Sequence, residues 1–244
     1  MTTTWIVLGA TSAMARPLIR ALATKGATIY LAGRDMDALE TLATDCRIAG
    51  APEAHAVKFD ARDASNYAEI VHSLAATEGT LNAISFVGSM PEQYEIDASP
   101  DLIADVVMDS MTGPATFLTR LAPVMEARGT GVIVGISSVA GDRGRLGNYV
   151  YGAAKAAFST YLSGLRNRLG RAGVHVMTVK PGPVDTPMTF GKKIPFMTTP
   201  EAVAKDILRG IEKRRNVIYT APIWRLVMAV ITHIPEPIFK KMSF

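Results

Sequence analysis

Tyr151 and Lys155, with Ser138 shortly upstream, are the residues of this 244-residue chain best suited to chemistry. Tyr151 and Lys155 are four positions apart, so on a helix their side chains share one face. A free tyrosine has a pKa near ~10 and exchanges protons poorly at neutral pH. A nearby cation lowers that pKa by stabilising the phenolate, and Ser138 can hydrogen-bond the same substrate oxygen. These side chains predict proton transfer to or from a carbonyl oxygen.

A strand, a loop of small residues, a helix and a second strand open the chain. Trp5–Leu8 is an apolar run typical of a buried strand, and a second such run follows at Thr28–Ala32. Between them lie the loop Gly9–Ala15 and a helical stretch that ends at about Lys25. In such a βαβ arrangement the helix N-terminus favours a phosphate, because its free N–H groups point at the ligand. The loop is therefore a candidate phosphate site, with an ordinary tight turn as the alternative.

Strand-like runs and helical stretches alternate along the whole chain, without an internal repeat or a low-complexity linker. The predicted strands are Trp5–Leu8, Thr28–Ala32, Ala54–Lys58, Leu81–Phe86, Gly131–Ile136, His175–Lys180 and Val217–Thr220. The predicted helices are Ala13–Lys25, Met36–Cys46, Ser65–Glu78, Leu102–Arg128, Val150–Gly170 and Pro200–Arg214. This alternation predicts an α/β fold with a Rossmann-type, doubly wound, parallel seven-stranded sheet in a single domain. The ligand crevice should open at the carboxyl ends of the strands, where Gly9, Ser138 and Pro181 fall.

In this order the motifs resemble those of the short-chain dehydrogenase/reductase family, over most of the chain up to about Thr189. The family's phosphate loop is similar to Leu8–Ala15, and its adenine-contacting aspartate aligns with Asp60. Its serine, tyrosine and lysine set aligns with Ser138, Tyr151 and Lys155 at the family's usual spacing. Its Pro-Gly-x-Val-x-Thr segment, which lies beside the nicotinamide, is similar to residues 181–186.

The resemblance implies an NAD(P)H-dependent oxidoreductase that transfers hydride between the nicotinamide and a carbonyl or secondary alcohol, with Tyr151 as general acid or base. In that role Ser138 orients the carbonyl, while Lys155 tunes Tyr151 and holds the ribose. The implied catalytic residues are Ser138, Tyr151, Lys155 and Ser110. The implied cofactor-binding residues are Gly9, Thr11, Ser12, Ala13, Met14, Arg34, Asp60, Tyr151, Lys155, Pro181, Gly182, Val184 and Thr186.

The chain departs from the family's pattern at Ala13, Ala15 and Ser110, and at Ser85–Gly88, which replaces the family's Asn-Asn-Ala-Gly stretch. Ala13 and Ala15 stand where loop glycines are usual; Ala15 suits helix–strand packing, whereas Ala13 demands an ordinary φ where the backbone approaches the pyrophosphate. Ser110 stands where the family has a helix asparagine of a proton relay, and a serine reaches less far than an amide. We expect a working active site with an altered relay. The alternative is a cofactor-sensing binding protein that kept the fold and lost turnover.

The end of the second strand bears on the choice of cofactor. An acidic residue there would accept the ribose hydroxyls of NAD and repel a 2′-phosphate. The chain has Gly33 and then Arg34, whose guanidinium can bind a phosphate. We therefore expect NADP. NAD is the alternative, in which Arg34 only stacks on the adenine, and the nearby Asp35 favours it.

Composition indicates one intracellular domain. A chain of this length with 48% hydrophobic residues can bury a large core. The single cysteine, Cys46, excludes an internal disulfide and fits a reducing compartment, and the N-terminus lacks the basic and long apolar regions of a signal peptide. The four histidines are scattered without ligand spacing, so we expect no metal site. The expected location is cytoplasmic.

The C-terminal tail, residues 222–244, differs from the dinucleotide-binding and catalytic part at 1–221. Residues 201–244 hold eight Lys or Arg against four Asp or Glu. Within the tail, Ile223–Ile234 is apolar but too short to span a bilayer. Tryptophan, aliphatic residues and flanking bases suit a segment lying in a membrane interface. A lid over the substrate pocket and packing across a dimer are the alternatives; without interleaved stacking aromatics, no nucleic-acid partner is expected.

The tail, the loop Gly9–Ser12 and the segment Ser137–Gly144 are together similar to reductases that act on polyprenyl-phosphate-linked keto-sugars. Arg143 and Arg145 precede Tyr151 and are candidates to meet a substrate phosphate, with a solvated surface loop as the alternative. The substrate is thus a soluble carbonyl compound or a lipid-linked one at the inner face of the membrane. Family members commonly pair through the helix that carries Tyr151, so a homodimer or homotetramer is expected.

Overall fold

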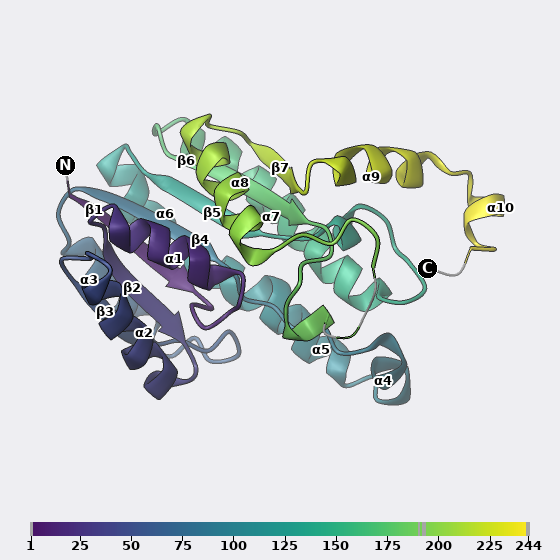
Figure 1. Ribbon diagram of the computed structural model, residues 1–244, viewed down its shortest axis with the longest axis horizontal. Helices are drawn as coiled ribbons and strands as arrows, with labels where there is room; N and C mark the ends of the chain where they lie inside the picture. Colours follow the sequence, from purple (N-terminus) through teal and green to yellow (C-terminus); the bar gives the residue numbers. More distant parts are fainter. Residues whose placement is uncertain (1, 190, 192–193, 243–244) are drawn as a thin grey trace.

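Seven parallel strands form one sheet at the centre of the molecule (Figure 1). The computed structural model describes residues 2–189, 191 and 194–242. The strands pair in the order β3-β2-β1-β4-β5-β6-β7, and every pair is parallel. Their bounds are β1 Thr3–Leu8, β2 Thr28–Gly33, β3 Ala54–Lys58, β4 Thr80–Ser85, β5 Val132–Ile136, β6 His175–Pro181 and β7 Val217–Thr220. The predicted doubly wound sheet is confirmed.

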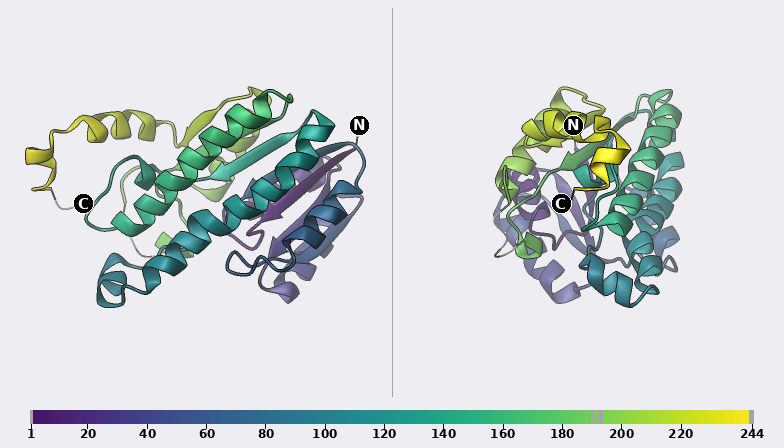
Figure 2. Two further views of the ribbon diagram at one scale, coloured as in Figure 1. Left: turned by 180° about the vertical axis from the view of Figure 1, so that it is seen from behind. Right: turned by 90° about the vertical axis from the view of Figure 1, so that its right-hand side faces the viewer.

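Helices cover both faces of the sheet, as Figures 1 and 2 show. The helices are α1 Ala15–Thr24, α2 Met36–Ile48, α3 Tyr67–Ala75, α4 Gln93–Ala98, α5 Leu102–Val107, α6 Gly113–Arg128, α7 Tyr149–Gly170, α8 Pro200–Glu212, α9 Ile223–His233 and α10 Glu236–Phe239. Short turns are η1 Met108–Thr112, η2 Val139–Asp142 and η3 Pro187–Thr189. Helices α1, α2 and α8 pack on one face, and α3, α6 and α7 pack on the other.

The apolar character of the central strands explains why both faces carry helices. On β1, Ile6 and Leu8 join the core under α3, α6 and α7, whereas Trp5 and Val7 join the core under α1, α2 and α8. All four side chains are buried. A strand buried on both faces has a continuous apolar sequence instead of an alternating one, which is typical of a parallel sheet.

The strand order reverses between β1 and β4, and the loops after these two strands approach each other closely there. Gly9 follows β1 with a φ of +74°, which few residues other than glycine adopt. A Cβ on Gly9 would lie 3.2 Å from backbone atoms of both Phe86 and Val87, which follow β4. An open parallel sheet binds its ligand at such a switch point.

The helix predicted at 102–128 has the predicted ends but is interrupted in its middle. It runs from α5 through the π turn η1 into α6. The wider turn places Ser110 in a fully buried position. Directly afterwards Gly113 packs on the backbone of Ala61, where a Cβ on Gly113 would lie 2.3 Å from the carbonyl oxygen. This contact seats α6 against the segment that follows Asp60.

The C-terminal tail folds into α9 and α10, helices that the sequence analysis did not predict, just as it did not predict α4. Trp224 and Met228 of α9 are buried against Val139, so α9 packs on the catalytic part of the chain. Beyond α9 the chain continues away from the sheet to α10, at one end of the molecule (Figures 1 and 2). In the part of the chain that the structure describes, no helix combines the length and apolarity needed to cross a membrane.

The close packing of Gly113 predicts an unusual response to alanine. Gly113→Ala should lower the free energy of unfolding by about 1–3 kcal/mol through overpacking, although alanine is the better helix former. Gly164 of α7 is the matched control, because a Cβ there meets nothing within 4 Å. Gly164→Ala should therefore raise stability by about 0.5–1 kcal/mol. Chemical denaturation measures the change in the free energy of unfolding for both variants. A Gly113→Ala protein as stable as the wild type would contradict the close contact with Ala61.

Candidate active site

Ser138, Tyr151 and Lys155 lie together at the carboxyl end of β5. Tyr151 and Lys155 are in the first turns of α7, and Ser138 follows the strand as the first residue before η2. The Ser138 Oγ accepts a hydrogen bond from the N–H of Ala140 at 3.1 Å and interacts with the Tyr151 hydroxyl. The Lys155 Nζ lies 5.7 Å from the centre of the Tyr151 ring. The structure therefore brings the three expected catalytic side chains into one place.

The Lys155 ammonium is buried between the ends of β4 and β5. Lys155 is only 3% exposed, and its Nζ donates to the carbonyls of Ile136 at 3.1 Å and Val87 at 3.3 Å. Gly88 leaves the space for it, because a Cβ on Gly88 would lie 2.8 Å from this Nζ and 3.3 Å from the Ser110 Oγ. No carboxylate among the described residues forms an ion pair with Lys155. Backbone carbonyls alone hold the charge.

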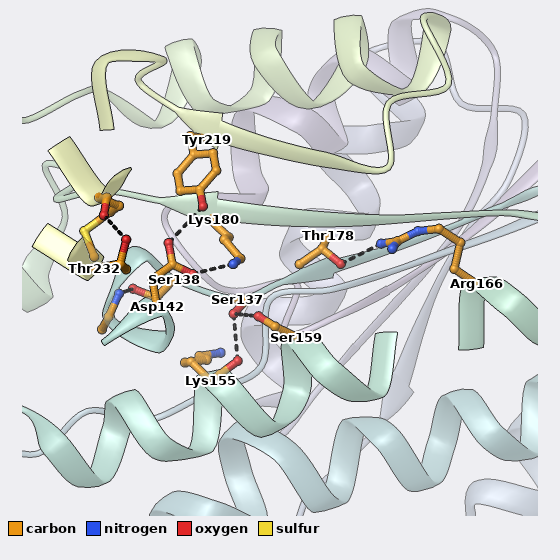
Figure 3. Close-up of polar contacts among 12 residues, drawn as sticks. Ser137, Ser138, Asp142, Lys155, Ser159, Arg166, Thr178, Lys180, Tyr219 and Thr232 are labelled. Atoms are coloured by element: carbon orange, nitrogen blue, oxygen red, sulfur yellow. Dashed lines mark hydrogen bonds and ion pairs between the residues drawn. The ribbon is translucent and has the colours of Figure 1, made fainter. Parts of the chain in front are cut away.

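Ser137, directly before Ser138, attaches α7 to the end of β5 (Figure 3). It is buried, its Oγ donates to the backbone carbonyl of Lys155 at 2.9 Å, and it shares a hydrogen bond with the Ser159 Oγ at 2.7 Å. These bonds fix where Lys155 enters the site. This role of Ser137 was not predicted, because the sequence of two adjacent serines does not reveal which one contacts the helix.

Burial dominates the acid–base behaviour of the pair. It raises the pKa of Tyr151 to about 12, while Ser138 and the positive charge of Arg145 act in the opposite direction. Burial also lowers the pKa of Lys155 to about 8. Arg145 is thus a second cation, besides the predicted Lys155, whose charge favours a lower pKa of Tyr151. At neutral pH Tyr151 holds its proton, as a general acid must.

A cavity at the switch point connects this pair to the loop after β1. Of the expected cofactor residues, it is lined by Gly9, Thr11, Ser12, Met14, Arg34, Asp60, Tyr151 and Lys155. The N–H groups of Thr11, Ala13 and Met14 donate to no group of the described residues, so they are available to a phosphate at the start of α1. Ala13 does not take a positive φ, so the alanine that departs from the family's pattern causes no backbone strain.

Two cations lie at the carboxyl ends of β2 and β3. Arg34 lines the cavity, and the Lys58 Nζ donates to the backbone carbonyl of Arg34 at 2.6 Å. Asp35, the nearby acid, is the N-cap of α2, and its Oδ1 accepts from the N–H of Ala38 at 3.0 Å. The carboxylate that favoured NAD in the sequence is therefore engaged in capping a helix.

A charged bridge links the Asp60 segment to the π turn. Arg62 donates from Nε and Nη2 to the two carboxylate oxygens of Asp109, both at 2.8 Å. Burial alone would raise the pKa of Asp109, but Arg62 holds it below its usual range. The Asp60 Oδ1 accepts from the N–H of Arg62 at 3.0 Å, and its backbone carbonyl accepts from the Tyr67 hydroxyl at 2.8 Å. Arg62 and Asp109 were not predicted from the sequence, because a pair 47 residues apart leaves no local pattern.

Ser110 does not line the cavity but supports its wall. Its Oγ pairs with the backbone N–H and carbonyl of Ser89, each at 3.3 Å. Ser89 does line the cavity, next to Gly88 and Lys155. The structure thus places Ser110 behind the loop that makes room for the Lys155 ammonium.

The expected cofactor residues that follow β6 do not line the cavity; they are Pro181, Gly182, Val184 and Thr186. The tail covers part of this segment. A Cβ on Gly182 would lie 2.1 Å from the indole Nε1 of Trp224, which itself donates to the carbonyl of Phe196 at 3.3 Å. Helix α9 therefore packs directly on the segment that the family resemblance puts beside the nicotinamide.

Asp142 ties the Ser138 segment to the two following strands (Figure 3). One carboxylate oxygen forms an ion pair with Lys180 of β6, and the other accepts from the hydroxyl of Tyr219 in β7 at 2.9 Å. The side chain of Asp142 is 9% exposed. Since η2 begins directly after Ser138, these contacts help to position that serine. Neither Asp142 nor Lys180 was a candidate from the sequence.

Comparison with known proteins agrees with this geometry. The family model for short chain dehydrogenase matches residues 3–193. An uncharacterised oxidoreductase of Mycobacterium tuberculosis is 33% identical over 97% of this chain and 96% of its own length. Two solved structures share the fold. A short chain dehydrogenase from Burkholderia cenocepacia in complex with NADP has a TM-score of 0.85 and 18% identity, over 98% of this chain and 97% of its own. A short-chain dehydrogenase from Sphingobium yanoikuyae in complex with NADPH has a TM-score of 0.82 and 22% identity, over 97% of each chain. The chain is therefore an oxidoreductase that belongs to the short-chain dehydrogenase/reductase family.

Proposed function

We propose that the protein reduces a carbonyl group with NADPH, or oxidises the corresponding alcohol in the reverse direction. The observation that carries this proposal is the meeting of Ser138, Tyr151 and Lys155 beside a cavity that continues to the phosphate loop. A buried ammonium held by carbonyls alone is a costly arrangement, and such costs are typical of functional sites.

Each of the three side chains has one task in this proposal. When bound, the cofactor would supply the hydride. The Ser138 hydroxyl holds the substrate's carbonyl oxygen next to Tyr151, and Tyr151 donates its proton to that oxygen as negative charge develops there. The Lys155 ammonium lines the cavity and would hold the ribose of the bound cofactor. Ser110, behind the Gly88–Ser89 loop, stays a candidate for the altered proton relay.

The cofactor we propose is NADP rather than NAD. The free N–H groups at the start of α1 suit a pyrophosphate. Arg34 and Lys58 suit a 2′-phosphate, and Asp35 is engaged in capping α2. The two solved structures named above, which hold NADP and NADPH, support the same choice.

Removing the proton donor tests the reaction. Tyr151→Phe should lower kcat about 10²- to 10⁴-fold, the usual contribution of general acid catalysis, while NADPH affinity stays close to that of the wild type. Tyr149→Phe is the matched control on the same helix, since Tyr149 bonds Asp97 outside the site. Assays with NADPH and a panel of ketones and aldehydes measure turnover. Near-normal turnover in Tyr151→Phe would refute the role, and wild-type NADPH binding without turnover on any carbonyl would favour the cofactor-sensing protein.

Arg34 tests the choice of cofactor. Arg34→Ala should raise the KM for NADPH about tenfold or more, because it removes charge-assisted hydrogen bonds to the 2′-phosphate, and should leave the KM for NADH nearly unchanged. Steady-state kinetics with both cofactors measures the two effects. Equal KM values for NADH and NADPH in the wild type would contradict the proposed preference.

We further propose that α9 and α10 contact an anionic membrane surface, at the inner face of the membrane. Leu226 and Val230 of α9 are 64% and 60% exposed, and Ile238 of α10 is 57% exposed. Leu226 and Val230 are four positions apart and lie on the side of α9 opposite the buried Trp224 and Met228. An enzyme held there would meet a lipid-linked carbonyl, such as a polyprenyl-linked keto-sugar; a soluble carbonyl compound is the alternative.

The charges of the tail match such a surface. Arg225, Lys240 and Lys241 are exposed. Glu236, the acid of the same segment, forms an ion pair with Arg143 at 2.9 Å. Apolar side chains among exposed bases suit the acyl boundary and the headgroups of an anionic leaflet.

Flotation with vesicles tests the membrane contact. The full chain should float with phosphatidylglycerol vesicles and not with phosphatidylcholine vesicles. The double variant Leu226→Glu, Val230→Glu should remain in the bottom fraction with both lipids. Ile48→Glu is the control, since Ile48 of α2 is an even more exposed apolar residue, at 81%, outside the tail. Wild-type protein that does not float with either lipid would contradict the contact. A dimer that the double variant converts to a monomer would instead give this face to a second copy.

The expected homodimer or homotetramer stays a prediction. On α7, Ala153 and Ala157 are exposed, Ala156 is partly buried and Ala154 is buried. The small exposed side chains leave room for a second helix to pack closely against this face.

A further inference from the structure

Two arginines in the loop between η2 and α7 differ sharply in their partners. Arg143 is fully engaged with the tail: its Nη1 donates to the carbonyls of Ile231 and Ile234, both at 2.6 Å, and its Nη2 pairs with Glu236. Its guanidinium also lies 3.6 Å from the centre of the Phe239 ring. Arg143 therefore binds the tail, and it is no longer a candidate for a substrate phosphate.

Arg145 has no comparable partner. Among the described residues its guanidinium forms no hydrogen bond and no ion pair, and its Nε is buried. The carboxylate whose charge acts on it belongs to Asp142, which already binds Lys180 and Tyr219. Burial lowers the pKa of Arg145, but an arginine stays charged at neutral pH.

A partly buried cation without a partner carries an uncompensated desolvation cost, and buried cationic groups in folded proteins are normally paired. We propose that Arg145 is the binding site for an anionic oxygen group of the substrate, a carboxylate or a phosphate. A guanidinium presents parallel N–H donors that match both groups in a bidentate arrangement. The loop is held ready for this role, because Arg143 fixes it to the tail on one side.

The position of Arg145 defines the substrate class. The backbone carbonyl of Arg145 accepts from the N–H of Asn148 at 3.2 Å, and the Asn148 carbonyl accepts at 2.8 Å from the N–H of Gly152, the residue after Tyr151. Arg145 thus begins the turn that leads directly to Tyr151, so the bound anion and the carbonyl that Tyr151 protonates belong to neighbouring parts of one molecule. The substrate is therefore an aldehyde or ketone that carries a nearby carboxylate or phosphate, a chemistry shared by small oxo acids and by phosphate-linked keto-sugars. The carbonyl half of this inference rests on the proposed reduction; the anion half rests on Arg145 alone.

Two pairs of compounds that differ in one charged group test the inference. They are acetoacetate against methyl acetoacetate, and dihydroxyacetone phosphate against dihydroxyacetone. Calorimetry with the full chain saturated with NADP⁺ measures their Kd values without turnover, and kcat/KM with NADPH is measured separately. The variants are Arg145→Gln and the control Arg171→Gln, which removes the same charge from an exposed position at the other end of α7.

Wild type and Arg171→Gln should bind at least one anion about tenfold or more tightly than its neutral partner. Arg145→Gln should lose that preference while its Kd values for NADPH and for the neutral compounds change less than about twofold. The pair of compounds that shows the larger difference in Kd identifies the group that Arg145 binds as a carboxylate or as a phosphate. An unchanged preference in Arg145→Gln, or no charge preference in the wild type, would overturn the inference. Preference that depends on Arg145, without reduction of any compound by NADPH, would uphold the anion site and reject the proposed reaction.

Discussion

A buried ammonium held only by backbone carbonyls is the constraint on which the site depends. The Lys155 Nζ bonds Ile136 at the end of β5 and Val87 just after β4, so these two segments must keep their places. Gly88 must lack a Cβ, and Ser137 must fasten α7 to the strand. The lowering of the Lys155 pKa to about 8 corresponds to a cost of roughly 3 kcal/mol for keeping the group charged. Ionisable groups with such strongly shifted pKa values cluster at functional sites, where a ligand contacts them.

A second constraint joins the tail to the loop that precedes the catalytic tyrosine. Asp142 binds β6 and β7, and Arg143 binds the end of α9, so the loop is held from both sides. Trp224 of α9 packs on Gly182, which connects the tail to the segment after β6 as well. In our proposals α9 therefore has two roles. One side positions the loop between η2 and α7, which holds Arg145, and the other side lies on the membrane.

Local patterns predicted the sheet and the cluster of Ser138, Tyr151 and Lys155, because apolar runs and four-residue spacing act over short stretches of chain. Partnerships between distant residues had no such signal, so Arg62 with Asp109 and Asp142 with Lys180 were missed. The π turn at 108–112 was missed because no residue type specifies it. The rise in the pKa of Tyr151 on burial was not predictable from the sequence either, since desolvation depends on the folded surroundings of the side chain.

The central claim is that Tyr151 gives its proton to the carbonyl oxygen, and the solvent isotope effect on a single turnover tests it most directly. The rate of ketone reduction by saturating NADPH would be measured in H₂O and in D₂O, with deuterated NADPH used to verify that hydride transfer limits the rate. The account predicts that D₂O slows the wild-type enzyme and has no such effect on the residual rate of Tyr151→Phe. A hydride-limited wild-type rate that is equal in both solvents would contradict it.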